Sequence, residues 1–120
     1  FKSINDSLGH AQGDACLIEA GRRLAACCSS EALVARIGGD EFAVITGPKA
    51  ALAPEHLCAS IVEAFREPFI LNGRPHQIGA SIGMARNIGQ DAEALYRNAD
   101  TALYQAKSAG RGTWRDFAAA

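Results

Sequence analysis

The sequence predicts a single α+β domain in which amphipathic helices alternate with β-hairpins. Two turn pairs, Gly38-Gly39 and Asn72-Gly73, each separate short apolar segments of the kind that pair as hairpins. Three other stretches carry apolar residues at helical spacing. The chain has 120 residues, 48% hydrophobic and 21% charged, which suits one compact soluble domain. Because hairpins pair antiparallel, we expect a mostly antiparallel sheet covered by helices.

The first helix is expected over residues 15–28, with Asp14 as its N-cap. The preceding segment, Phe1 to Gly13, is rich in turn-forming residues and is interpreted as a strand end followed by a loop. The apolar face of the helix combines five residues at helical spacing: Leu17, Ala20, Gly21, Leu24 and Cys28. The charged residues Glu19, Arg22 and Arg23 are placed on the opposite face.

The first hairpin is expected over residues 33–45. Residues 33–37 alternate in polarity, and Gly38-Gly39 can form the tight reversal because glycine tolerates positive φ. The return strand, residues 42–45, is a short apolar run that we expect to be buried on both faces. This arrangement places Asp40 and Glu41 at or just past the hairpin tip.

The second half of the chain predicts a helix, a hairpin, a helix and a closing strand. The second helix begins at Pro54, carries the apolar stripe Leu57, Ile61, Val62 and Phe65, and ends by Pro68. The second hairpin pairs residues 69–71 with residues 77–85. The last helix is capped near Asp91 and stops at Gly110. Residues 114–117 form an edge strand, and the tail 118–120 is expected to be frayed.

Composition excludes several classes of protein. A net charge of −1 and a pI of about 6.3 give no bulk attraction to nucleic acid or to an anionic membrane. Neither a signal peptide nor an apolar run of membrane-spanning length is present, so we expect a cytoplasmic domain. The four cysteines lack zinc-ligand spacing and are expected to be small buried thiols in a reducing compartment.

Three groups of residues could carry chemistry, although each also has an ordinary structural explanation. Asp40 and Glu41 beside two glycines could bind magnesium, which prefers carboxylate oxygens, but the same residues also make common solvated turns. Lys107 and Arg111 could bind phosphate, or could offset the dipole at a helix C-terminus.

The third group lies in the opening segment. Asn5 and Asp14 could match the donor and acceptor edge of a purine, but they are also ordinary turn and cap residues. His10 lies in the same segment, where most histidines are simply loop residues.

Taken together, these residues form four motifs in register. They are Phe1-Lys2-x-Ile4-Asn5-Asp6-x-x-Gly9-His10-x-x-Gly13-Asp14, then Arg36-x-Gly38-Gly39-Asp40-Glu41-Phe42, then Ser81-Ile82-Gly83, and finally Ala99-Asp100-x-Ala102-Leu103-Tyr104-x-Ala106-Lys107-x-x-Gly110-Arg111. This pattern resembles the GGDEF family of diguanylate cyclases over residues 1–117. The resemblance implies a fold like the palm of nucleotidyl cyclases and polymerases, with a central, mostly antiparallel sheet wrapped by helices.

The resemblance also implies a reaction. Two GTP molecules condense to cyclic di-GMP with release of two pyrophosphates, in a face-to-face homodimer with magnesium or manganese as cofactor. Catalysis in such a site depends on positioning and on stabilisation of phosphate charge. A sensor or phosphodiesterase domain is expected to flank the domain in the parent chain, which could itself be membrane-anchored. Neither nucleic acid nor a membrane is expected to contact the domain.

Site residues follow from the same resemblance. Gly38 and Gly39 let the substrate lie against the hairpin, Asp40 matches the metal ligand and 3′-hydroxyl base, and Glu41 matches a supporting carboxylate. The remaining positions match substrate-binding residues: Asn5, His10 and Asp14 at the guanine, the backbone of Phe1 and Lys2 at the terminal phosphates, and Lys107 and Arg111 as the phosphate-neutralising pair.

This sequence departs from the family pattern at two places. The family carries Asp-x-Asp before Phe-Lys, and its first Asp is a metal ligand; here the sequence starts at Phe1, so we expect the first strand to be largely missing and this chain alone to be inactive. The family's inhibitory product site is Arg-x-x-Asp, but these positions hold Ser29 and Ala32, so we expect little feedback there.

Two alternative functions are weighed against the cyclase. A silent GGDEF domain would bind GTP and regulate a neighbouring domain; the intact motif favours the enzyme. An RNA-binding module would need exposed aromatic residues and basic surroundings, and the aromatic content of 7% with a net charge of −1 disfavours it.

Overall fold

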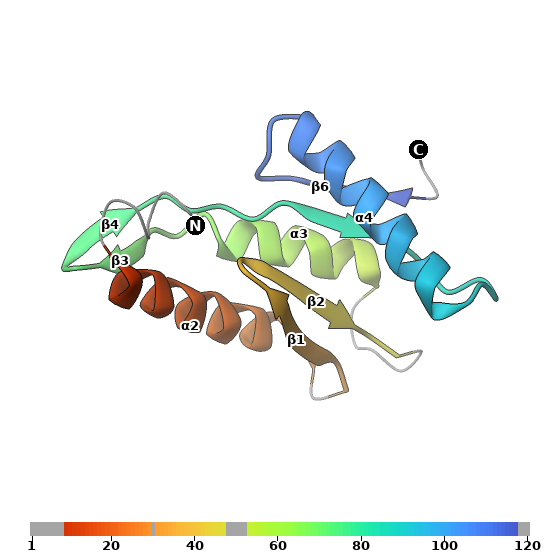
Figure 1. The fold of residues 1–120 in the computed structure, drawn as a ribbon, viewed down its shortest axis with the longest axis horizontal. Helices are drawn as coiled ribbons and strands as arrows, with labels where there is room; N and C mark the ends of the chain where they lie inside the picture. Colours follow the sequence, from red (N-terminus) through yellow and green to blue (C-terminus); the bar gives the residue numbers. More distant parts are fainter. Residues whose placement is uncertain (1–8, 30, 48–52, 118–120) are drawn as a thin grey trace.

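The computed structural model describes residues 9–29, 31–47 and 53–117, which form three helices and six strands. Figure 1 shows α2 and α3 side by side, with α4 on the far side of the strand that follows the second hairpin. The helices are α2 (His10–Cys27), α3 (Pro54–Ala64) and α4 (Ala92–Ser108). The strands are β1 (Leu33–Gly38), β2 (Glu41–Ile45), β3 (Phe69–Leu71), β4 (Arg74–His76), β5 (Ile82–Met84) and β6 (Trp114–Asp116).

The six strands pair as three ladders, which confirms the α+β class. β1 pairs with β2 and β3 pairs with β4, both antiparallel, as expected for hairpins. β5 and β6 pair in parallel. This parallel pair follows from the connection between them, because α4 carries the chain back to the starting end of β5 before β6 begins.

Helix α2 begins at His10, earlier than the predicted start after Asp14. Gly9 is its N-cap residue, with a φ of 90°, and the amide of Gly13 donates to the Gly9 carbonyl at 3.1 Å. The prediction that Asp14 caps the helix is therefore wrong, because Asp14 lies within it. Gly9 and Gly13 both favoured a loop in the sequence, since glycine has a low helix propensity. In the structure Gly9 precedes the helix, whereas Gly13 lies within it and is buried.

The second hairpin has a shorter return strand than predicted. Its turn is Asn72-Gly73, where both residues have positive φ, at 55° and 74°. These values suit the primed turns that match strand twist. The return strand is β4, in which Pro75 stands opposite Ile70, whereas the predicted span 77–85 contains only β5. Pro75 has no amide to donate, but proline is tolerated on edge strands, and both strands of this two-stranded sheet are edges.

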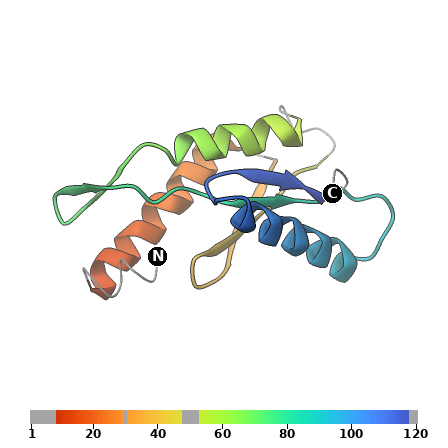
Figure 2. The same cartoon turned by 90° about the horizontal axis from the view of Figure 1, so that it is seen from above.

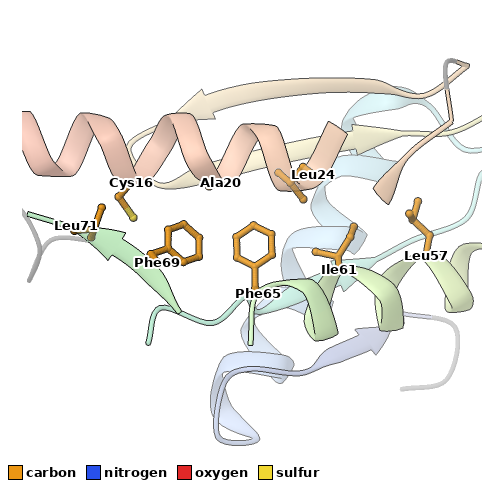
Figure 3. Packing of buried hydrophobic residues seen from close by; sticks show 8 residues of the cluster. All are labelled: Cys16, Ala20, Leu24, Leu57, Ile61, Phe65, Phe69 and Leu71. Atoms are coloured by element: carbon orange, nitrogen blue, oxygen red, sulfur yellow. The ribbon is translucent and has the colours of Figure 1, made fainter. Parts of the chain in front are cut away.

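The hydrophobic core cluster of the described residues lies between α2, α3 and β3 (Figure 3). Phe69 is fully buried, and its ring centroid lies 5.6 Å from that of Phe65, in a tilted arrangement favourable for aromatic pairs. The predicted stripe of α3 is confirmed, since its four apolar residues are all buried: Leu57, Ile61, Val62 and Phe65. Cys16 from α2 and Leu71 from β3 close the cluster.

Arg23 belongs to this cluster, contrary to the prediction that it lies on the solvent face of α2. Its side chain is only 11% exposed, and its guanidinium lies 3.9 Å from the Phe69 ring centroid. The guanidinium donates to the carbonyls of Ala64, Glu67 and Pro68, at distances of 2.6 to 3.0 Å. It therefore satisfies the carbonyl of Ala64, the last residue of α3, and two carbonyls in the segment that joins α3 to β3.

The hairpin of β1 and β2 packs on the cluster through one face. Val34, Phe42 and Val44 pack against the core cluster from one face of this hairpin. Leu33 and Ile45 pair across the other face and are 59% and 63% exposed. The expectation that β2 is buried on both faces is therefore wrong for the described residues, because α2 covers one side of this hairpin and nothing in the described part covers the other.

Helix α4 packs on β5 and β6, and its predicted ends are confirmed. The Asp91 carboxylate accepts a hydrogen bond from the Ala94 amide at 2.8 Å, as an N-cap does. Gly110 follows the C-cap with a φ of 111°, a conformation suited to glycine.

All four cysteines are free thiols: Cys16 and Cys58 are buried, while Cys27 and Cys28 are half-buried. Burial raises the pKa of the Cys58 thiol to about 11, which keeps it protonated at neutral pH. No helix among the described residues is long and apolar enough to cross a membrane.

Candidate functional site

The tip of the first hairpin is formed by Gly39 and Asp40, one residue later than predicted. Gly38 pairs with Glu41 across the turn, and the register shifts between Arg36 and Gly38. Because Gly39 has a φ of 53°, its position favours glycine over residues with a side chain. The prediction that Asp40 and Glu41 sit at or just past the tip is confirmed.

Gly38 and Gly39 face open space. A Cβ atom added at either position would meet no atom of the described structure within 4 Å. Gly38 also lacks a positive φ, so neither backbone strain nor close packing within the described residues explains a glycine there. A second glycine at an exposed tip is instead suited to close approach of a bound molecule to the backbone.

The side chain of Arg36, in β1, forms a hydrogen bond to the backbone of this tip. Its Nε atom donates to the carbonyl oxygen of Gly39 at 2.9 Å, so the side chain spans the turn. Sequence reasoning placed Arg36 in the hairpin motif but gave it no role. The hydrogen bond restricts the orientation of the peptide group that joins Gly39 to Asp40.

The two carboxylates at the tip are available for a ligand. Asp40 is exposed and Glu41 is half-buried, and within the described residues neither side chain makes an ion pair or a hydrogen bond. The described residues contain no group of three or more His, Cys, Asp and Glu side chains that could hold a metal alone. Magnesium is commonly bound by one or two carboxylates together with substrate phosphates and water, so this donor set fits that type of site.

Two cations lie at the end of α4. Lys107 is in the last turn and Arg111 follows in the loop, and both are exposed. Neither side chain forms an ion pair or hydrogen bond with another described residue, so both charges remain available for an anion. Arg111 itself has a φ of 63°, which is uncommon for a residue with a side chain.

The hairpin tip and the end of α4 lie on one side of the molecule. Figure 2 shows the tip on the α4 side of the β5–β6 pair, with α3 on the opposite side. In both Figure 1 and Figure 2 the tip is nearer to the C-terminal end of α4 than to its N-terminal end. The backbone of the hairpin tip and the C-terminal end of α4, which come from distant parts of the sequence, therefore lie on the same side of the β5–β6 pair.

The remaining predicted site residues are only partly described. Asp14 is exposed on α2 and has no capping role, so its carboxylate is free for a ligand within the described part of the chain. Phe1, Lys2 and Asn5 lie outside the described residues, as does the side chain of His10. Their roles at guanine and phosphate stay predictions.

Residues 1–113 match the sequence profile of the family described as "Diguanylate cyclase, GGDEF domain". The diguanylate cyclase DgcN from Escherichia coli is 41% identical over 110 residues, a match that covers 89% of this chain and 27% of DgcN. The cyclic di-GMP phosphodiesterase PdeR from Escherichia coli is 36% identical over 119 residues, covering 98% of this chain and 18% of PdeR. The chain thus spans less than a third of the length of these curated relatives.

Solved structures give the same result. The GGDEF domain of YfiN (TpbB) from Pseudomonas aeruginosa superposes with a TM-score of 0.88 at 37% identity. The superposition covers 96% of this chain and 74% of that one. At this identity and coverage, the likeness extends over nearly all of the fold described above.

Proposed function

The chain belongs to the GGDEF family of diguanylate cyclase domains, and from this premise we propose that it condenses GTP to cyclic di-GMP. In each half-reaction the 3′-oxygen of one GTP bonds to the α-phosphorus of another, and the bond from that phosphorus to the leaving pyrophosphate breaks. The second half-reaction closes the ring, so two GTP give one cyclic dinucleotide and two pyrophosphates. The hydroxyl proton is lost at each step.

Asp40 is the residue to which we assign the central role. Its free carboxylate at the hairpin tip can accept the 3′-hydroxyl proton and, with support from Glu41, can hold magnesium. When bound, magnesium would supply charge stabilisation at the reacting phosphate. Gly38 and Gly39 allow the nucleotide to lie against the backbone, because no described atom fills the space beside them.

Lys107 and Arg111 are assigned to the phosphates. Both charges at the end of α4 have no partner within the described part of the chain, and the planar guanidinium of Arg111 can bind phosphate oxygens in a bidentate manner. Neutralising the charge of the terminal phosphates favours binding of GTP, and these contacts are made to substrate and transition state alike. Asn5 and Asp14 would read the guanine, with His10 in the same segment, and the backbone of Phe1 and Lys2 would meet the terminal phosphates.

A second copy of the domain completes the reaction. The assigned residues bind one GTP, and each half-reaction joins two, so two domains must meet face to face. Positioning of two bound nucleotides then supplies much of the rate enhancement.

One observation carries the proposal: an exposed Asp40 without a partner among the described residues sits on an open glycine turn. Within the described residues this carboxylate contributes no hydrogen bond or ion pair to the fold, so it is open to a metal ion or a substrate hydroxyl. The test is incubation of the full-length protein with GTP and magnesium, followed by chromatography of the products. We expect cyclic di-GMP and pyrophosphate in a ratio of one to two; unchanged GTP would refute the enzyme assignment.

A silent regulatory domain is the second candidate, because the relative PdeR is named for phosphodiesterase activity. A domain of this class would bind GTP and alter the activity of an attached domain without turning GTP over. Calorimetric titration with GTP distinguishes the two: binding without cyclic di-GMP formation supports the regulatory role, and binding with turnover supports the cyclase.

A further inference from the structure

The segment before β5 is joined directly to the loop that carries Arg111. The Ser81 hydroxyl oxygen accepts a hydrogen bond from the Gly112 amide at 3.1 Å, and the Ile82 amide donates to the Thr113 carbonyl at 3.0 Å. Gly112 and Thr113 immediately follow Arg111 in the sequence. The position of the Arg111 backbone is therefore linked to a segment about thirty residues earlier in the chain.

The loop has an unusual backbone. Gly110, Arg111 and Gly112 have consecutive φ values of 111°, 63° and 60°. Left-handed backbone is tolerated by glycine but is unfavourable for arginine, so contacts outside the loop must hold it. Among the described residues, the Gly112 amide donates to the Ser81 hydroxyl oxygen on one side of the loop. On the other side, the Gly110 amide donates to the Lys107 carbonyl at 3.3 Å and the Arg111 amide to the Ala106 carbonyl at 3.2 Å.

Gly83 fixes the distance between β5 and α4. A Cβ atom added at Gly83 would lie 2.1 Å from the Ala99 carbonyl oxygen and 2.2 Å from the Leu103 amide nitrogen. The strand and helix backbones are therefore in direct contact, which leaves little freedom to slide. Ser81 stands two residues before this contact, and Lys107 stands one helical turn beyond Leu103.

We propose that Ser81 is a positioning residue for GTP binding. Its hydroxyl holds the Gly110–Gly112 loop in the left-handed conformation that presents Arg111, beside Lys107, to the phosphates of the nucleotide. This inference rests on the proposed function of the same site. Ser81 acts through the Gly112 amide and makes no contact with substrate itself.

Removal of the hydroxyl should weaken substrate binding more than chemistry. In the full-length protein, Ser81→Ala is expected to raise the KM for GTP about three- to tenfold, the effect of one lost hydrogen bond. The kcat should stay within about twofold, because the affected contact binds substrate and transition state alike. Ser81→Thr, which keeps the hydroxyl, should restore the KM.

Ser108→Ala is the matched control. Ser108 is an exposed serine on α4, and its side chain has no hydrogen bond to the described residues, so the KM should not change. A Ser81→Ala variant with the wild-type KM, or a Ser81→Thr variant that behaves like Ser81→Ala, would overturn the proposal.

Gly112 provides a second test that leaves Ser81 intact. Asparagine tolerates left-handed backbone far better than alanine, so Gly112→Asn should keep the KM and Gly112→Ala should raise it. Equal KM values for these two variants would contradict the proposal that the left-handed backbone of the Gly110–Gly112 loop positions Arg111 for GTP binding. If the wild-type protein converts GTP but the variants do not change the KM as predicted, only the positioning role of Ser81 is rejected and the proposed function stands. A wild-type protein that neither binds nor converts GTP would instead reject the proposed function together with this inference.

Discussion

Two arginines show how differently two regions of this domain use the same side chain. Arg23 is almost buried between α2 and α3, where it donates to three carbonyls, pairs with Glu19 and lies over Phe69. Arg111 is exposed on a left-handed loop, and its guanidinium has no partner among the described residues. The hydrogen bonds of Arg23 stabilise the fold, whereas the exposed guanidinium of Arg111 is available to bind a ligand.

The same contrast separates the two regions as a whole. The region of α2, α3 and β3 fills its interior with Phe65, Phe69 and Leu71, all nearly inaccessible to solvent. The region of the hairpin tip and the Arg111 loop has open glycines, together with charged side chains that have no partner among the described residues. We therefore expect substitutions in the first region to change stability and substitutions in the second to change function.

The largest loss of stability is expected from Phe69→Ala. Phe69 is fully buried, so its removal loses apolar burial and leaves a cavity, which together cost about 3–5 kcal/mol of unfolding free energy. Denaturant unfolding followed by circular dichroism measures this loss. Tyr104→Ala removes an aromatic ring that is 73% exposed, and it should stay within about 0.5 kcal/mol of wild type. Equal losses in the two variants would contradict the placement of the core.

Arg23→Ala should cause the second largest loss of unfolding free energy, about 2–3 kcal/mol. The substitution leaves the carbonyls of Ala64, Glu67 and Pro68 without their shared donor. Arg22 is the matched control, since it is one residue away on α2 with a side chain 66% exposed. Arg22→Ala should cost no more than about 1 kcal/mol. A comparison of the two by thermal unfolding tests the structural role of Arg23; similar midpoints would show that the fold does not depend on it.

Gly83→Ala should lower the unfolding free energy by about 1–3 kcal/mol, because the added methyl group would collide with the backbone of α4 at Ala99 and Leu103. Gly21→Ala is expected to act in the opposite direction. Gly21 lies within α2 and an added Cβ would reach only ordinary contact with Phe42 at 3.9 Å, so the higher helix propensity of alanine should stabilise the protein slightly. The sign of the change in unfolding midpoint distinguishes the two glycines.

The smallest expected effect is a pH dependence of stability at Glu19. Hydrogen bonds from Arg22 and Arg23 lower the pKa of the Glu19 carboxyl from 4.5 to about 2. Because the folded pKa lies below the unfolded value, the contribution of Glu19 is fully present above pH 4.5 and is lost as the pH falls through about 2. The difference in unfolding free energy between wild type and Glu19→Gln should therefore shrink over this range. A constant difference would indicate that the two ion pairs do not form in solution.

The sequence alone predicts elements whose signals are local. Pro54 and Asp91 mark the starts of α3 and α4, Gly110 marks the end of α4, and two turn pairs mark the hairpins. Features that depend on distant partners were missed. The buried position of Arg23 could not be predicted from the sequence, because the carbonyls that accept its hydrogen bonds lie 41 to 45 residues away in the chain.

The candidate site shows the same limit. Residue types made Asp40, Lys107 and Arg111 candidates, and the resemblance to the GGDEF family, rather than their spacing alone, assigned them roles. Their freedom from internal partners depends on the fold and could not be predicted. The hydrogen bond from Gly112 to Ser81 joins motifs that are far apart in sequence, so only the structure shows that they are connected.

The most direct test of the contrast between the two regions is a paired measurement on Asp40→Asn in the full-length protein. Cyclic di-GMP formation and unfolding midpoint are measured on the same preparation. We predict that product formation falls at least about 100-fold, because the amide neither takes up the proton nor carries the charge that holds a cation. The unfolding midpoint should not change, since Asp40 is exposed and makes no contact that the described fold uses. An Asp40→Asn variant that keeps the wild-type rate would contradict the account, as would one that unfolds several degrees earlier.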